Sequence, residues 1–152
     1  PSGFTTNQTL ITDNLTNANT KSRMRMVTLY QIAGVVKGIV VGTGNKVEDF
    51  GVGFYTKYGD GGVDISPIAD CNKTQIWEIG KELGILKEII DAAPTDGLWD
   101  DGRTDEGQLG LKYEELEEAM TNPNSANRSK YETIRKQNMH KMEPIPVCII
   151  PN

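Results

Sequence analysis

Residues 38–73 read GIVVGTGNKVEDFGVGFYTKYGDGGVDISPIADCNK, and this stretch decides the fold that the sequence predicts. It opens with the apolar run Ile39–Val41, which has the length of a buried strand. A glycine-rich segment follows, with the polar and charged side chains Thr43, Glu48, Lys57, Asp60, Asp64 and Lys73. In open α/β sheets, ligands bind in the crevice beyond the carboxyl ends of the strands. The stretch therefore predicts an α/β fold with an anionic-ligand pocket at the end of one strand.

Familiar short motifs do not identify the ligand. The turn Gly42–Asn45 fits neither G-x-x-x-x-G-K-[ST] nor G-x-G-x-x-G, and such a turn often needs glycine only for a positive φ. The acidic residues that follow do not match a calcium-binding loop. Taken singly, Asp64 and Asp70 fit turn or cap residues. No Ser/His/Asp set or zinc cluster can be argued from the residues alone.

Helices are predicted on both sides of this stretch. Apolar side chains recur at three- and four-residue steps over residues 15–36, which favours a helix whose apolar face packs in the core. Further helices are predicted over residues 73–83, 87–92, 113–120 and 128–139, with His140 and Lys141 just past the last one. Lys73 opposes the dipole of the helix that it begins, which hints at another role. We expect residues 1–14 to be flexible, 95–110 to be a mobile loop or a plain connector, and 144–152 to be extended.

Composition narrows the partners. The chain has 152 residues, enough for one domain, and a formal net charge of -5. An acidic balance argues against a nucleic acid or an anionic membrane as partner. No apolar run approaches the roughly 18–20 residues of a membrane span. Cys71 and Cys148 lie far apart in sequence, so we expect free thiols in a reducing compartment, the cytoplasm.

Several longer runs together resemble the ammonia-dependent NAD synthetases. In chain order they are RMRM (23–26), GTGNKVED (42–49), FYTKYGDGGVD (54–64), PTDGLW (94–99) and RTDEGQLGLKYEEL (103–116). The resemblance implies a Rossmann-like, doubly wound parallel sheet of the adenine nucleotide alpha hydrolase-like kind, and a homodimer. It also implies a reaction in which Mg-ATP adenylates the nicotinate carboxylate of deamido-NAD. Ammonia then attacks the acyl-adenylate and gives NAD and AMP.

The same resemblance assigns roles to individual residues. It implies that deamido-NAD is bound by Arg23, Lys57, Asp64, His140 and Lys141. It implies that ATP is bound by Thr43, Lys73 and Thr95, and that Glu48 is a ligand of Mg²⁺, an ion that prefers oxygen donors.

One part of the family pattern is missing. The phosphate-binding loop S-G-G-x-D-S lies upstream of the family segment that matches Arg23, and nothing in residues 1–22 resembles it. We therefore expect this chain to be a C-terminal portion of the enzyme, with an incomplete sheet and without activity alone. Two alternatives stay open: another ATP pyrophosphatase-type synthetase, such as a GMP or argininosuccinate synthetase, and a non-catalytic nucleotide-binding or dimerisation module. Whether the nitrogen donor is ammonia or glutamine depends on the full protein. No glutamine amidase region is visible in this sequence, and this favours ammonia.

Overall fold

The longest helix, α2 (Asn14–Val36), begins the part of the chain that this computed structural model describes, residues 14–151. It ends where Lys37 takes a left-handed backbone conformation, with φ of 55°. The Gly38 amide then donates to the Ala33 carbonyl oxygen at 2.8 Å and closes the last turn. The predicted helix over residues 15–36 is confirmed, although a lysine and not a glycine makes the left-handed turn.

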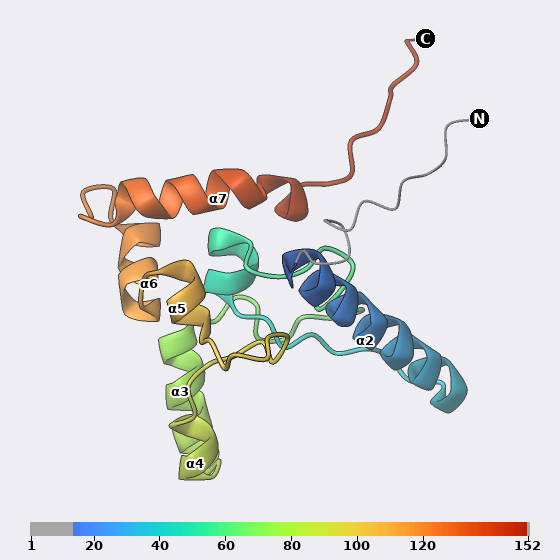
Figure 1. Ribbon diagram of the computed structural model, residues 1–152, viewed down its shortest axis with the longest axis horizontal. Coiled ribbons are helices and arrows are strands. Elements are labelled where there is room, and N and C mark those ends of the chain that lie inside the picture. The colour runs from blue at the N-terminus through green and yellow to red at the C-terminus, as the bar shows by residue number, and fades with distance from the viewer. Residues whose placement is uncertain (1–13, 152) are drawn as a thin grey trace.

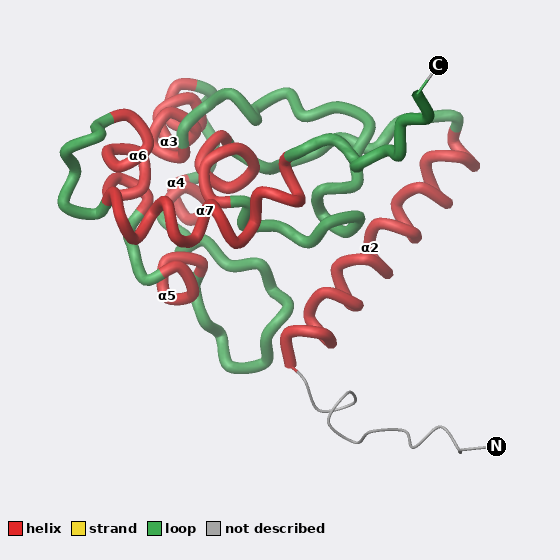
Figure 2. The backbone as a smooth tube through the Cα atoms, turned by 90° about the horizontal axis from the view of Figure 1, so that it is seen from above, coloured by secondary structure: helices red, strands yellow, loops and turns green. Residues whose placement is uncertain are grey.

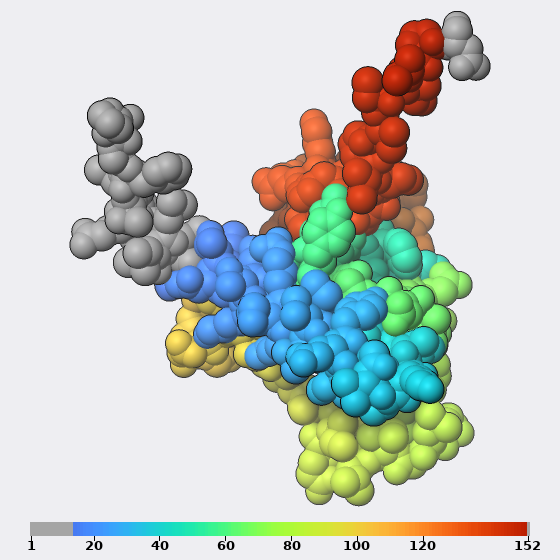
Figure 3. Space-filling model, turned by 90° about the vertical axis from the view of Figure 1, so that its right-hand side faces the viewer, coloured from blue at the N-terminus to red at the C-terminus, as the bar shows by residue number. Residues whose placement is uncertain are grey.

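The apolar face of α2 was predicted to pack in the core, but most of it is exposed. Only the small residues Ala18, Ser22 and Ala33 of this helix are buried. Leu29, Tyr30 and Val36, from the face expected to pack, are exposed, as are Met24, Val27, Ile32 and Val35. Seen from above, α2 runs obliquely beside the loops, apart from α3, α6 and α7 (Figure 2). Its atoms cover much of one face of the molecule (Figure 3).

The predicted strand Ile39–Val41 is reduced to one parallel bridge. Val41 pairs with Ile65, and the Gly42 amide donates to the Ile65 carbonyl oxygen at 2.7 Å. Val40 is buried, whereas Ile39 and Val41 on either side of it are exposed. This alternation is that of a strand with one covered face, so the expectation of a fully buried strand is wrong. Within residues 14–151 no regular sheet is present, so the described residues do not carry the predicted doubly wound sheet.

The remaining elements follow in short steps along the chain (Figure 1). A π-helical turn, η1, follows the first loop, and four of the later helices were predicted to within three residues at each end. Helix α5 was not predicted. The elements are η1 (Val47–Val52), α3 (Lys73–Glu82), α4 (Lys87–Ile90), α5 (Asp105–Leu109), α6 (Tyr113–Thr121) and α7 (Arg128–Met142).

The core lies where η1 meets α5, α6 and α7. Side chains from these elements form one buried apolar cluster, and Trp77 of α3 packs against its edge. Tyr113 and Leu116 of α6 have no exposed surface and are among its largest members. The cluster therefore fixes η1, which carries Glu48, against the helices. Its buried members are Val47, Val52, Leu109, Leu111, Tyr113, Leu116, Ala119 and Tyr131.

Helix α7 is longer than predicted. It extends to Met142, so His140 and Lys141 belong to its last turn and do not lie past its end. Beyond it, residues 144–151 are extended and exposed, as the prolines predict. In the described part of the chain, no helix combines the length and the apolar character that a membrane crossing requires.

Candidate functional site

A cavity of about 450 Å³ lies between α2, the loop around the Val41–Ile65 bridge and the segment that leads into α5. Thr43, Glu48, Lys73 and Thr95 all line it. These are the residues to which the resemblance assigned ATP and the metal. The structure thus brings together four side chains from three separate stretches of the sequence.

Glu48 is held in the cavity from several sides. The Asn45 side-chain oxygen accepts hydrogen bonds from the backbone amides of Val47 and Glu48, at 3.0 and 3.1 Å, and so caps the start of η1. One carboxylate oxygen of Glu48, Oε1, accepts the Tyr113 hydroxyl at 2.5 Å and lies 3.4 Å from Lys73 Nζ. Both charged side chains are mostly buried, so this ion pair is less screened than a surface pair.

Lys73 is the first residue of α3, as predicted. Asn72 caps the helix, and the Gln75 side chain accepts from the Asn72 amide at 2.9 Å. This capping box fixes the start of α3 and therefore the point from which Lys73 extends. The Lys73 ammonium lies 5.0 Å from the centre of the Tyr113 ring and also faces Glu48.

Asp105 is a lining residue that the sequence analysis did not single out. It is 7% exposed, one of its oxygens has no hydrogen-bond partner among the described residues, and the other lies 3.4 Å from the Tyr113 hydroxyl. Burial, followed by the charge of Glu48, raises the pKa of Asp105 to about 6. A helix-start signal could have found it, since Thr104 caps α5 by accepting from the Gly107 amide.

Four of the five residues assigned to deamido-NAD form a separate group outside the lining of this cavity. Arg23 Nε donates to the Lys57 carbonyl oxygen at 3.2 Å, and Lys57 Nζ donates to the His140 carbonyl oxygen at 2.8 Å. Lys141 Nζ donates to two carbonyl oxygens of the segment before Lys57, and burial lowers the pKa of Lys141. Arg23, Lys57, His140 and Lys141 are therefore joined across α2, the loop and α7.

Asp64 lies apart from these four residues. Its carboxylate accepts the Val40 amide at 2.7 Å and the Tyr30 hydroxyl at 3.2 Å. These contacts fix the extended segment against α2. The structure thus gives Asp64 a local structural contact, and its role toward deamido-NAD stays a prediction.

The segment 95–110 is anchored to α2 at several points. Arg25 donates to the carbonyl oxygens of Asp96 and Gly97, and Lys21 Nζ donates to that of Leu98. The Asp96 carboxylate accepts from the Leu98 amide, the Trp99 indole and the Gln108 amide group.

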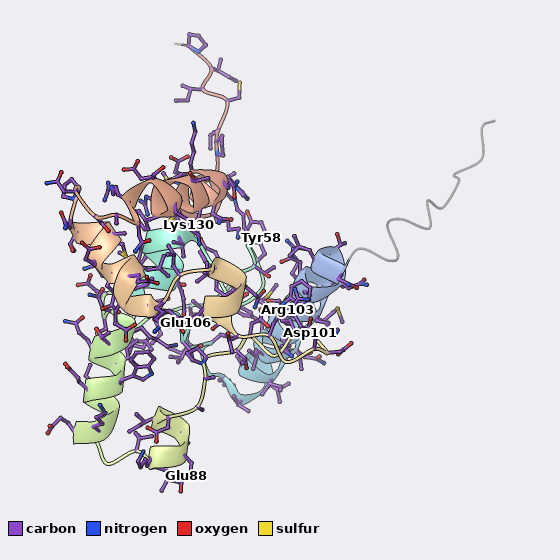
Figure 4. All side chains as sticks on the ribbon, turned by 60° about the vertical axis from the view of Figure 1, so that its left-hand side comes forward. Tyr58, Glu88, Asp101, Arg103, Glu106 and Lys130 are labelled. Atoms are coloured by element: carbon purple, nitrogen blue, oxygen red, sulfur yellow. The ribbon has the colours of Figure 1, made fainter. Side chains whose placement is uncertain are left out.

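At the tip of the segment 95–110, Arg103 pairs with Asp101, and the two lie side by side in Figure 4. The Arg103 guanidinium also lies 4.0 Å from the centre of the Trp99 ring. The mobility of the segment 95–110 stays a prediction.

The cavity fits Mg²⁺ only together with a phosphate ligand. Within residues 14–151 no three His, Cys, Asp or Glu side chains gather closely enough to hold a metal by themselves. Mg²⁺ is commonly bound by one or two carboxylates together with substrate phosphates and water. Glu48 supplies one such carboxylate, and Asp105, which has one unpartnered oxygen, lines the same cavity. These residues therefore fit a metal that arrives with a nucleotide.

The raised pKa of Asp105 predicts how stability depends on pH. A carboxyl whose pKa is higher in the folded state contributes stability below its unfolded pKa, and this contribution is lost as the pH rises through about 6. We expect D105N to remove a stabilisation of roughly 2 kcal/mol that the wild type gains between pH 7 and pH 4. Urea unfolding of both proteins in metal-free buffer measures it, with E114Q, an exposed acid on α6, as control. Parallel pH profiles for D105N and the wild type would contradict it.

Comparison with known proteins shows the family of this chain. The family model described as NAD synthase matches residues 3–148. An NH(3)-dependent NAD(+) synthetase of Carboxydothermus hydrogenoformans is 40% identical over 85% of this chain and 53% of its own length. One from Methanosarcina acetivorans is 47% identical over 71% of this chain and 41% of its own. The chain spans about half the length of the curated relatives it matches, or less.

Solved structures agree as well. The NMN synthetase of Francisella tularensis superposes with a TM-score of 0.82, at 34% identity, over 95% of this chain and 60% of that one. The NH3-dependent NAD synthetase of Campylobacter jejuni, solved with a nitrate ion, gives a TM-score of 0.61 over 97% of this chain and 58% of that one; at 24% identity it supports the fold alone. From the match over nearly its whole length, the chain belongs to the NAD synthase family.

Proposed function

We propose that this chain is part of an enzyme that amidates deamido-NAD to NAD with ammonia, and that it carries residues for ATP, for Mg²⁺ and for deamido-NAD. The observation that carries the proposal is the meeting of Thr43, Glu48, Lys73 and Thr95 in one cavity, in a chain of the NAD synthase family. A lysine, two hydroxyls and a carboxylate are suited to a triphosphate and its magnesium ion.

The chemistry explains why these groups are needed. A carboxylate is a poor electrophile, so its oxygen first attacks the α-phosphorus of ATP and pyrophosphate leaves. Ammonia then attacks the resulting acyl-adenylate, AMP leaves, and a proton passes to solvent. Lys73 offsets the charge that develops on the triphosphate, and Mg²⁺, when bound through Glu48, adds to this stabilisation. Thr43 and Thr95 orient the nucleotide by hydrogen bonds.

The residues outside the cavity are proposed to bind the acceptor, deamido-NAD. Hydrogen bonds to backbone carbonyl oxygens hold the side chains of Arg23, Lys57 and Lys141, and the carbonyl oxygen of His140 accepts the bond from Lys57. The charges of Arg23 and the two lysines suit the two phosphates and the carboxylate of deamido-NAD, and His140 completes the proposed set. Asp64 borders the extended segment that leads to the cavity and is the remaining acceptor-binding residue in this proposal.

A second acceptor deserves a direct comparison. The Francisella tularensis protein whose structure matches 95% of this chain is an NMN synthetase. The deamido form of NMN has the same nicotinate carboxylate but lacks the adenylate half. The curated relatives at 40% to 47% identity, named NAD synthetases, favour the dinucleotide.

The fold, assembly and location follow from the same family. We propose that the parallel bridge between Val41 and Ile65 belongs to a doubly wound parallel sheet whose further strands lie outside residues 14–151. The exposed apolar side chains of α2, such as Val27, Ile32 and Val35, support a homodimer, because a second copy can cover them. The cytoplasm is the compartment proposed for this reaction.

An assay with both acceptors tests the function. The full-length natural protein that contains this chain is incubated with Mg-ATP, ammonium and either deamido-NAD or its mononucleotide counterpart. We expect NAD, AMP and pyrophosphate in equal amounts, with a higher kcat/KM for the dinucleotide. Release of ADP and phosphate, or amidation with glutamine alone, would contradict the proposal; faster turnover of the mononucleotide would assign the second acceptor instead.

A further inference from the structure

Tyr113 contacts Glu48 and Lys73, two of the charged residues that line the cavity, without lining it itself. It is the first residue of α6 and has no exposed surface. Its hydroxyl lies 2.5 Å from Glu48 Oε1, and its ring centre lies 5.0 Å from Lys73 Nζ. One buried side chain therefore touches the groups proposed to hold the metal and the phosphates of ATP.

The hydroxyl acts as a hydrogen-bond donor to Glu48. A tyrosine hydroxyl keeps its proton at neutral pH, because its ordinary pKa is about 10. An ionised carboxylate can only accept, and Glu48 is closer to the hydroxyl than Asp105 is. The donated bond fixes the rotation of the Glu48 carboxylate and leaves its other oxygen, Oε2, bonded only weakly to the Asn45 amide at 3.4 Å.

The ring acts on Lys73. A lysine ammonium within about 6 Å of an aromatic ring centre is attracted to the ring face, and that of Lys73 lies 5.0 Å away. The ring itself cannot easily turn, because Trp77 packs edge-on against it at 6.1 Å and the Tyr113 amide donates to Glu106 at 3.0 Å. Its position is thus set by α3, α5 and the start of α6.

We propose that Tyr113 is a positioning residue, which orients Glu48 through its hydroxyl and Lys73 through its ring so that both face the phosphates of metal-bound ATP. The proposal rests on the proposed function, because it takes Glu48 as a magnesium ligand and Lys73 as a phosphate ligand. It goes beyond that function by naming a side chain that acts through both residues without touching the substrate.

Two substitutions separate the hydroxyl from the ring. Y113F keeps the ring and loses the donor, and we expect it to weaken Mn²⁺ binding about tenfold in the presence of α,β-methylene ATP, as loss of a metal ligand's hydrogen-bond partner commonly does. Its affinity for the analogue without metal stays at the wild-type value. Y113L also removes the ring and weakens the metal-free affinity as well. Electron paramagnetic resonance of free Mn²⁺ and calorimetry measure these affinities in the full-length natural protein.

The matched control is Y131F, at another tyrosine buried in the same core. Y131F should bind both ligands as the wild type does. Mn²⁺ affinity that is unchanged in Y113F, or reduced equally in Y131F, would overturn the proposal. If Y113F does not fold, Y113F/E48A removes both partners of the bond and should bind the analogue and Mn²⁺ as E48A does; weaker binding would overturn it. These affinities are measured without turnover. A wild type that binds the analogue but makes no NAD would therefore contradict the proposed reaction and not the role of Tyr113.

Discussion

E48Q is expected to lower turnover by roughly 100- to 1000-fold, the usual cost of removing a group that stabilises developing charge. Glutamine keeps the shape of the side chain and an oxygen that can accept the Tyr113 hydroxyl, but it loses the negative charge that we propose binds Mg²⁺. The loss should therefore appear in kcat at saturating ATP, with the KM for deamido-NAD little changed. Steady-state kinetics of the full-length natural protein, read through a coupled dehydrogenase, measure it.

The control for this experiment is E78Q, a substitution of an exposed glutamate on α3. Both variants remove one negative charge, so a general effect of net charge would appear in each. Circular dichroism checks that E48Q folds, since it also breaks the ion pair with Lys73. Equal turnover by E48Q and E78Q would contradict the role of Glu48.

The cavity residues were predicted by resemblance and not by local pattern. Thr43, Glu48 and Thr95 sit in turns whose chemistry is that of ordinary loops, so their meeting depends on the path of the whole chain. Lys73 alone carried a local hint, because a cation at the start of a helix opposes the helix dipole. Tyr113 was missed because a tyrosine at the start of an amphipathic helix predicts core packing, which it also has.

The exposure of α2 shows what periodicity leaves open. Apolar residues at helical spacing establish that a helix has an apolar face, but they do not say which element covers it. Here the buried contacts come from Ala18, Ser22 and Ala33, where small side chains let the loops approach. The same limit applies to Ile39 and Val41. Their β-branched side chains favour a strand, but among the described residues the bridge joins Val41 to Ile65 and extends no further.

The end of α7 could have been predicted from one residue. A residue that precedes proline avoids the helical conformation, and Glu143, just before Pro144, is extended with ψ of 151°. The helix therefore continues to Met142 and places His140 and Lys141 in its last turn, where the lysine cation is favoured by the helix dipole. Reading the proline as the stop signal gives the observed boundary.

The affinity of K73M for Mg-ATP tests the central claim most directly. Lys73 is a mostly buried cation in the cavity, and methionine keeps much of its length without the charge. Loss of a charge-assisted contact of this kind costs up to about 3 kcal/mol, or roughly 100-fold in affinity. K81M, at an exposed lysine near the end of the same helix, is the control. The account predicts that calorimetry on the full-length natural protein finds binding roughly 100-fold weaker in K73M and unchanged in K81M; wild-type affinity in K73M would contradict it.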